Sequence, residues 1–207
     1  MKQIFVFIFA FILFSVTPCA LGLEQWSGFR GPNGQGISAS TDLPTKWSAS
    51  ENIAWKTPIS GSGWSSPVIW NDHIFLTTAT DGGKECRVLA VDRKNGDILW
   101  DKMVFTQEIK QKHPSNSDAT PTPVTDGQRV YALFAGGSFV ALDFEGNIVW
   151  TNTELDYYSH HGLGVSPMIY GDLLITSINP SSKEEPVRLG WQIPWEKSYL
   201  WALDIST

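Results

Sequence analysis

The chain has 207 residues, of which 42% are hydrophobic and 17% charged, so it is long enough for one domain or for part of a larger one. Its formal net charge is -6 and it contains no run of Lys or Arg, which disfavours nucleic-acid binding because phosphate contacts need a concentrated basic surface. The 18 Gly, 12 Pro and 10 Trp residues are typical of a turn-rich, all-β protein with aromatic packing.

The first residues carry the pattern of a secretory signal peptide. A lysine near the start is followed by an apolar run over residues 4–16 and by small residues, so we expect cleavage after Gly22 and export to the periplasm or the medium. A lipoprotein anchored through Cys19 is disfavoured by Pro18. An uncleaved membrane anchor is disfavoured because a spanning helix needs roughly 20 apolar residues. Removal of residues 1–22 leaves Cys86, which cannot form an internal disulfide and which we expect to be a buried apolar residue.

Residues 23–52 are predicted to form a turn-rich prelude. Its GPNGQG segment lacks the Lys and Ser/Thr of a phosphate-binding loop, so we interpret it as a series of turns. The segment that follows, NIAWKTPI from Asn52 to Ile59, predicts a lone outer strand over residues 53–59 that contains Trp55.

Three later stretches of the chain repeat one pattern of short strands. Each has a small residue and Pro, then apolar residues, a polar turn and a β-rich run. The first turns are Asn71-Asp72, Asp126-Gly127 and Gly171-Asp172, and the second turns include Asp81-Gly82-Gly83 and Gly136-Gly137. The repeats therefore predict hairpins at regular intervals along residues 64–207.

The third strand of each repeat ends in a shared phrase, which reads AVDRKNGDILW, ALDFEGNIVW and ALDIST in chain order. A fourth strand follows the first two copies. The three aspartates are 51 (143 − 92) and 61 (204 − 143) residues apart. Four short antiparallel strands at this period indicate β-propeller blades at 64–104, 119–155 and 164–207, the last one truncated. The alternative, a sandwich of hairpins, is disfavoured by the regular register.

The phrase has a structural interpretation. We expect the carboxylate of Asp92 to accept hydrogen bonds from turn amides, and Asn95-Gly96 to take left-handed geometry. We expect Trp100 to pack on the neighbouring blade, with its indole N–H donating to the backbone. Trp55 occupies the same place in its strand, so we expect residues 53–59 to close the propeller ring and remove a free edge. The predicted docking positions are Trp55, Asp92, Gly96, Trp100, Asp143, Gly146, Trp150 and Asp204.

The copy at 90–100 resembles the tryptophan-docking motif of propellers with pyrroloquinoline quinone (PQQ)-like repeats, with Asn95 where that motif has Thr. These propellers include quinoprotein alcohol dehydrogenases and the outer-membrane assembly factor BamB. The segments FRGPNGQG (29–36) and HHGLGVSP (160–167) are also similar to exported members. The resemblance covers residues 26–207 and implies about seven or eight blades, so we expect this chain to be an N-terminal fragment. The alternative is a short protein completed by oligomerisation.

The resemblance implies two functions. Quinoprotein dehydrogenases hold PQQ and calcium at the ring centre and carry an adjacent Cys pair, an Asp base, and Glu and Asn ligands. This chain has no adjacent Cys pair, and it has no hydrolase motif. We therefore expect a non-enzymatic binding or scaffold module with no cofactor, no catalytic residue and no metal site. The alternative is a quinoprotein oxidoreductase whose catalytic residues lie in blades beyond this chain.

Segments that link one blade to the next should lie on one propeller face, together with the turns between second and third strands. The candidate ligand-face residues are His113, Asn116, His160 and His161, and the long loop from Asn179 to Ser198, with Trp191 and Trp195, joins them. The alternative role for these side chains is to cap turns and link blades. Adjacent residues of an extended chain point to opposite sides, which disfavours a metal held by both His160 and His161. We expect His73 to be a solvated turn residue, and a protein or small ligand to bind this face.

Overall fold

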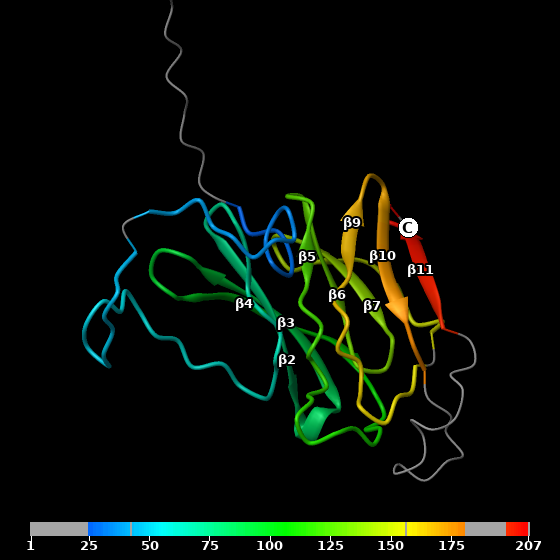
Figure 1. Ribbon diagram of the computed structural model, residues 1–207. Coiled ribbons are helices and arrows are strands. Elements are labelled where there is room, and N and C mark those ends of the chain that lie inside the picture. The colour runs from blue at the N-terminus through cyan, green and yellow to red at the C-terminus, as the bar shows by residue number, and fades with distance from the viewer. Residues whose placement is uncertain (1–24, 42, 156, 181–197, 207) are drawn as a thin grey trace, which may run out of the picture.

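The computed structural model describes residues 25–41, 43–155, 157–180 and 198–206, so the predicted signal peptide, Trp191 and Trp195 lie outside the described residues. Within these ranges the chain is all-β, apart from one short 3₁₀ turn. Its strands form three separate antiparallel sheets, with the orders β1-β2-β3-β4, β5-β6-β7-β8 and β9-β10-β11, which stand side by side (Figure 1). The predicted fold class, a propeller of four-stranded blades that is incomplete in this chain, is confirmed.

The sheets coincide with the three predicted repeats. The first blade contains β1 (Val68–Trp70), β2 (His73–Thr80), η1 (Asp81–Gly83), β3 (Glu85–Asp92) and β4 (Ile98–Thr106). The second contains β5 (Val124–Thr125), β6 (Arg129–Leu133), β7 (Phe139–Asp143) and β8 (Ile148–Asn152). The third contains β9 (Met168–Tyr170), β10 (Leu173–Ile178) and β11 (Tyr199–Asp204).

The hydrophobic core lies between the blades. Phe75 and Val88 of the first blade pack in one cluster with Val130 of the second, and Tyr131 of the second blade belongs to another cluster with Leu174 of the third. Neighbouring residues of β6 therefore point to opposite blades, and both are fully buried. This explains why the two middle strands of the second blade, β6 and β7, are mostly continuous apolar runs instead of alternating ones.

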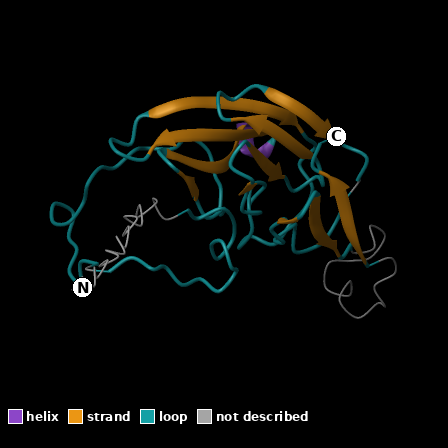
Figure 2. Ribbon diagram, turned by 90° about the horizontal axis from the view of Figure 1, so that it is seen from above, coloured by secondary structure: helices purple, strands orange, loops and turns teal. Residues whose placement is uncertain are grey.

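Residues 53–59, predicted as a ring-closing strand, have no strand assigned in this structure, so the predicted strand stays a prediction. This segment belongs to the long N-terminal loop that extends to one side of the sheets in Figure 2. No described strand pairs with it, so side chains hold it instead. The indole Nε1 of Trp55 donates to the carbonyl of Arg93 at 3.0 Å, and Thr57 Oγ1 donates to the carbonyl of Gly96 at 2.5 Å. A role for this segment in closing the ring stays a prediction.

Antiparallel pairing puts the connections of each blade at two opposite ends. In the first blade, His73 pairs with Asp92 at one end of the β2–β3 ladder, and Thr80 pairs with Glu85 at the other. We call the first end the docking face; it holds the turns at 71–72, 93–97, 126–128 and 144–147. The second end, the link face, holds the turns at 81–84 and 134–138 and the inter-blade links at 107–123, 153–155 and 157–167.

Candidate ligand face

The docking face joins consecutive blades through tryptophan side chains. Trp100 Nε1 donates to the carbonyl of Phe144 at 2.8 Å, and Trp150 Nε1 donates to the carbonyl of Ile205 at 3.0 Å. Each acceptor follows the aspartate of the next repeat, as Arg93 follows Asp92 in the contact of Trp55. The indoles also require small neighbours, since a Cβ on Gly146 would lie 2.8 Å from Trp100 Cδ2. We propose that the predicted docking positions hold neighbouring blades together.

The aspartates of these turns accept the hydrogen bonds expected of them. Asp92 Oδ1 accepts the backbone N–H groups of Lys94 and Asn95 at 2.7 and 3.2 Å. Gly96 is left-handed, with φ of 79°, whereas Asn95 is not, because its side chain instead holds Asp97 through two hydrogen bonds. The left-handed geometry predicted for both residues is therefore wrong for Asn95.

Asp143 and Asp204 occupy equivalent places in the later turns. Partial burial raises the pKa of the Asp143 carboxyl, but hydrogen bonds from the side chain and backbone of Asn147 outweigh it and leave the pKa below its usual range. Hydrogen bonds from the hydroxyl and amide of Ser206 lower the pKa of Asp204. Both carboxylates are thus favoured in their charged form as turn acceptors.

On the link face, the links and turns form one continuous hydrogen-bonded layer. Gln107 donates to the carbonyl of Gly83 at 2.8 Å and accepts from the amide of Gly136 at 3.1 Å. The amide of Tyr157 in turn donates to the carbonyl of Gly136, and its hydroxyl donates to the carbonyl of Asn179 at 3.1 Å. Segments from all three blades therefore meet on this face.

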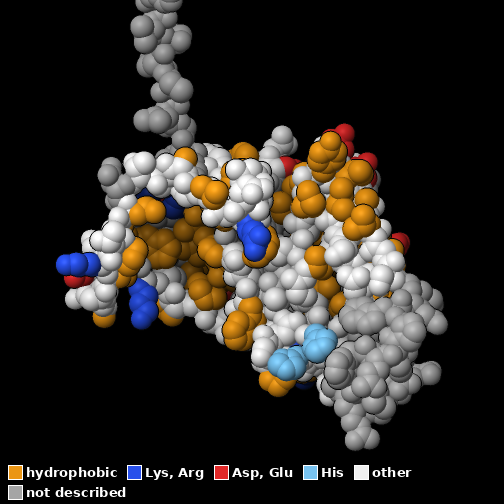
Figure 3. All heavy atoms as spheres, viewed as in Figure 1, with side chains coloured by type: hydrophobic (Ala, Val, Ile, Leu, Met, Phe, Trp, Pro, Cys, Tyr) orange, Lys and Arg blue, Asp and Glu red, His pale blue; other side chains and the backbone are white. Residues whose placement is uncertain are grey.

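The structure brings His113, Asn116 and His161 together. The amide of Asn116 donates to the carbonyl of His161 at 2.6 Å, and the two imidazole rings have centroids 5.9 Å apart. Both histidines are exposed, and histidine side chains are visible at the lower edge of the molecule in Figure 3. The Nδ1 of His113 also accepts the amide of Ser115, so this ring caps a turn as well.

His160 does not lie on this surface. Only 4% of it is exposed, and its Nδ1 lies 3.1 Å from the hydroxyl of Tyr158. His160 is thus buried, unlike His113 and His161, and a ligand contact by His160 stays a prediction. The prediction for His73 is wrong, since it begins β2 and its ring stacks on Phe75 and contacts Phe144.

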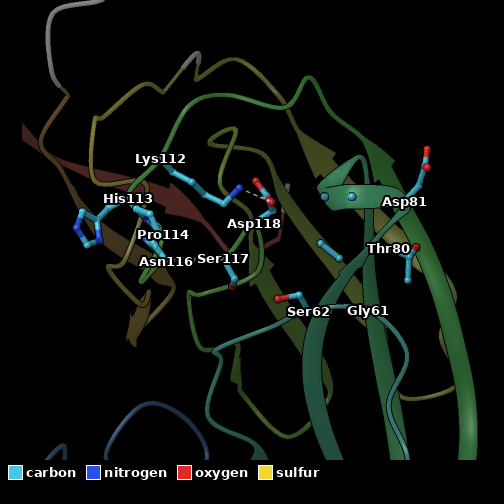
Figure 4. Close-up of a pocket in the computed structure, with 13 residues that line it drawn as sticks. Gly61, Ser62, Thr80, Asp81, Lys112, His113, Pro114, Asn116, Ser117 and Asp118 are labelled. Carbon is cyan, nitrogen blue, oxygen red and sulfur yellow. Dashed lines mark hydrogen bonds and ion pairs between the residues drawn. The ribbon is translucent and has the colours of Figure 1, made fainter. Parts of the chain in front are cut away.

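A cleft opens between the first link and the turn η1, with a volume of about 610 Å³, which falls within the usual range for small-molecule sites, roughly 300–1,000 Å³. The ammonium of Lys112 lies 2.7 Å from the carboxylate of Asp118, and the two side chains point toward each other while His113 points away (Figure 4). On the other side lie Thr80 and Asp81. The remaining lining comes from Gly61, Ser62, Ala79, Gly82, Gly83, Pro114, Asn116 and Ser117.

The Lys112–Asp118 pair is a feature that sequence reasoning missed. The two residues are six apart in an irregular link, and no motif marks them. Gly83 is the one indirect sign in the sequence that a close contact lies here, because its φ of 107° and its approach to Asp118 exclude a side chain at this position. A Cβ on Gly83 would lie 2.2 Å from Asp118 Oδ2, so glycine at this turn is what lets the carboxylate approach.

The described residues do not fit the PQQ and calcium site that the dehydrogenase resemblance implies. No three His, Cys, Asp or Glu side chains of the described ranges lie close enough together to hold a metal. Burial, with a smaller contribution from Asp118, raises the pKa of Cys86 to about 12, and this buried thiol has no disulfide partner.

Residues 24–156 match the family model described as outer membrane protein assembly factor BamB, which is 133 of the 207 residues (156 − 24 + 1). These blades are thus those of a PQQ-like repeat protein, and the chain belongs to this BamB family. No curated protein matches it. Among the described residues, no helix is long and apolar enough to cross a membrane.

Solved structures of similar proteins include BamB from Moraxella catarrhalis, at 16% identity and a TM-score of 0.46, where the match covers 74% of this chain and 37% of that one. Quinohemoprotein alcohol dehydrogenase ADHIIG from Pseudomonas putida HK5 is 18% identical with a TM-score of 0.49, covering 75% and 21%. A europium-containing methanol dehydrogenase is 16% identical with a TM-score of 0.46, covering 68% and 22%. The chain spans less than two fifths of the length of each.

Proposed function

We propose that this protein is an exported, non-enzymatic propeller module that binds a partner protein through its link face. The observation that carries the proposal is the cleft beside η1, which is lined in part by Lys112, Asn116 and Asp118 and lies in a hydrogen-bonded layer built from successive blades. The family supports it, because the matching family model describes an assembly factor. The docking face is less available, since its turn carbonyls already accept indole N–H groups from preceding blades or from the N-terminal loop.

Site-specific photo-cross-linking in the producing cell tests which face binds. A cross-linker at His113 samples the link face, and one at Lys94, which is also exposed, is the control on the docking face. We expect one discrete cross-linked protein from position 113, lost when Lys112 and Asp118 are both replaced by alanine, and none from position 94. A discrete product from position 94 alone would contradict the choice of face.

The quinoprotein alternative has its own test. The full-length protein is titrated with PQQ and calcium while absorbance and dye reduction are followed. Saturable binding with dye reduction would overturn the non-enzymatic proposal, whereas no binding at micromolar PQQ supports it. Export is tested separately, because N-terminal sequencing of the mature protein should begin at Leu23.

A further inference from the structure

The start of the prelude is bonded to the innermost strands of two different blades. Trp26 exchanges both backbone hydrogen bonds with Ile69 of β1, at 2.9 and 2.8 Å, and the carbonyl of Ser27 accepts the amide of Thr125 of β5 at 2.9 Å. The strands β1 and β5 contact each other, and β5 contacts β9. Their edges away from β2 and β6 are the ones that face a propeller axis, so residues 26 and 27 occupy two axial edges at once.

Side chains fix the same segment at the docking face. Gln25 forms two hydrogen bonds with Asn71, one from its amide nitrogen to Asn71 Oδ1 at 2.9 Å and one from the Asn71 backbone amide at 2.8 Å. Asn71 belongs to the β1–β2 turn, which lies on the docking face. Residues 25–27 therefore contact the inner edges of β1 and β5 and also the β1–β2 turn at the docking-face end of these strands.

Glycines allow the segment to fold back over the inner strands. Gly28 is buried against Val124, where a Cβ would lie 3.2 Å from Val124 Cγ2. Gly31 has a φ of 78°, and a Cβ there would lie 2.9 Å from the indole of Trp26. Val124 and Thr125 are accordingly only 6% and 3% exposed, although they form an inner strand. A larger residue at 28 would press against Val124 of β5, and one at 31 would displace Trp26, which pairs with Ile69 of β1.

We propose that residues 25–31 form a strap that closes the docking-face end of the propeller axis, so that ligands enter the axis from the link face. The strap also covers the free edges of β1 and β5, which would otherwise present unpaired backbone groups. At the other end, the inner segments are joined to each other, since the amide of Ser66 donates to Thr122 Oγ1 at 3.0 Å. The proposal concerns access to the axis and stands whether or not the link face binds a protein.

Cysteine labelling of the full chain tests the strap. Val124→Cys places a thiol under it, and maleimide labelling is measured at each cysteine by peptide mass spectrometry. Gly31→Ala is the opening variant, and Gly34→Ala is its matched control, because Gly34 has a φ of 69° but nothing within 4 Å. Buried Cys86 reports in the same sample whether the first blade has unfolded.

We expect Gly31→Ala to speed labelling at position 124 about tenfold through local opening, Gly34→Ala to change it less than about twofold, and Cys86 to stay unlabelled. Equal rates at position 124 with and without Gly31→Ala would overturn the strap. If Gly31→Ala also exposes Cys86, Gln25→Ala decides: faster labelling confined to position 124 supports the proposal, and no change refutes it.

A second thiol tests whether closure is one-sided. Ser66→Cys lies on the link-face side of β1 and is partly exposed. The labelling rate at position 66 should be the same with and without Gly31→Ala or Gln25→Ala. A rise at position 66 equal to that at 124 would show that the strap does not separate the two ends of the axis.

Discussion

Replacing Gly146 by alanine tests the docking of Trp100 on the second blade. Gly146 has a φ of 85°, so alanine there costs about 1–2 kcal/mol in backbone conformation alone. Its Cβ would also lie 2.8 Å from Trp100 Cδ2, which forces the half-buried indole outward. Overpacking of this kind costs about 1–3 kcal/mol, part of which is the lost hydrogen bond to the Phe144 carbonyl. We expect the free energy of unfolding to fall by roughly 3 kcal/mol.

Gly171→Ala is the matched control, because Gly171 has a φ of 58° but no neighbouring atom within 4 Å of the place where the alanine Cβ would lie. It should cost only the backbone part, about 1–2 kcal/mol. Urea unfolding followed by circular dichroism measures both. A double-mutant cycle adds Trp100→Leu, in which Gly146→Ala should cost no more than Gly171→Ala. Equal costs for the two glycine variants, or a Gly146→Ala cost that Trp100→Leu leaves unchanged, would refute the docking argument.

Three further predictions concern single side chains. Because folding lowers the pKa of the Asp143 carboxyl, this group stabilises the folded protein above pH 3.8, and the stabilisation is lost as pH falls through the lower folded-state pKa. Asp143→Asn should therefore lose less stability than wild type on acidification below about pH 4, as measured by urea titrations. Asn116→Ala, which removes the link to the His161 carbonyl, should lower the free energy of unfolding by about 1–2 kcal/mol, against less than about 0.5 for exposed Asn33→Ala. The Cys86 thiol, with a pKa of about 12, should resist maleimide at pH 8 in the folded protein and react in urea.

The repeats predicted the strands and their turns well, because each strand pairs with its neighbour in sequence and local signals mark the ends. The turn at Asp126-Gly127 and the phrase ending in Trp150 show this. Residues 53–59 form no strand among the described residues because a strand needs a neighbouring edge, and a single sequence does not show which edge is available. The prediction for His73 failed for a related reason, since the Phe144 ring that packs on it comes from the next repeat.

The candidate site was predicted only in outline. Placing the links on one face followed from the alternation of antiparallel strands, so His113, Asn116 and His161 were found. The sequence did not predict the Lys112–Asp118 pair or the hydrogen bonds between Gln25 and Asn71, because each depends on how irregular segments fold in space. No periodicity constrains such segments, and Gln25 and Asn71 are 46 residues apart in the sequence.

The two faces have different roles because the connections on one face are constrained by contacts between blades and those on the other can vary. In each docking turn, the carbonyl of the residue after the aspartate accepts an indole N–H from the preceding blade. A glycine is also needed where the indole of Trp100 lies on the turn of the second blade. The length and sequence of these turns are therefore constrained. Link-face connections share one repeated contact, in which the amide of Ser66 donates to Thr122 Oγ1 and that of Thr122 donates to Ser166 Oγ. Apart from this contact they differ in length between blades, as the short turn η1 shows. Because a scaffold tolerates change where packing does not depend on it, specificity for a partner should reside in these connections.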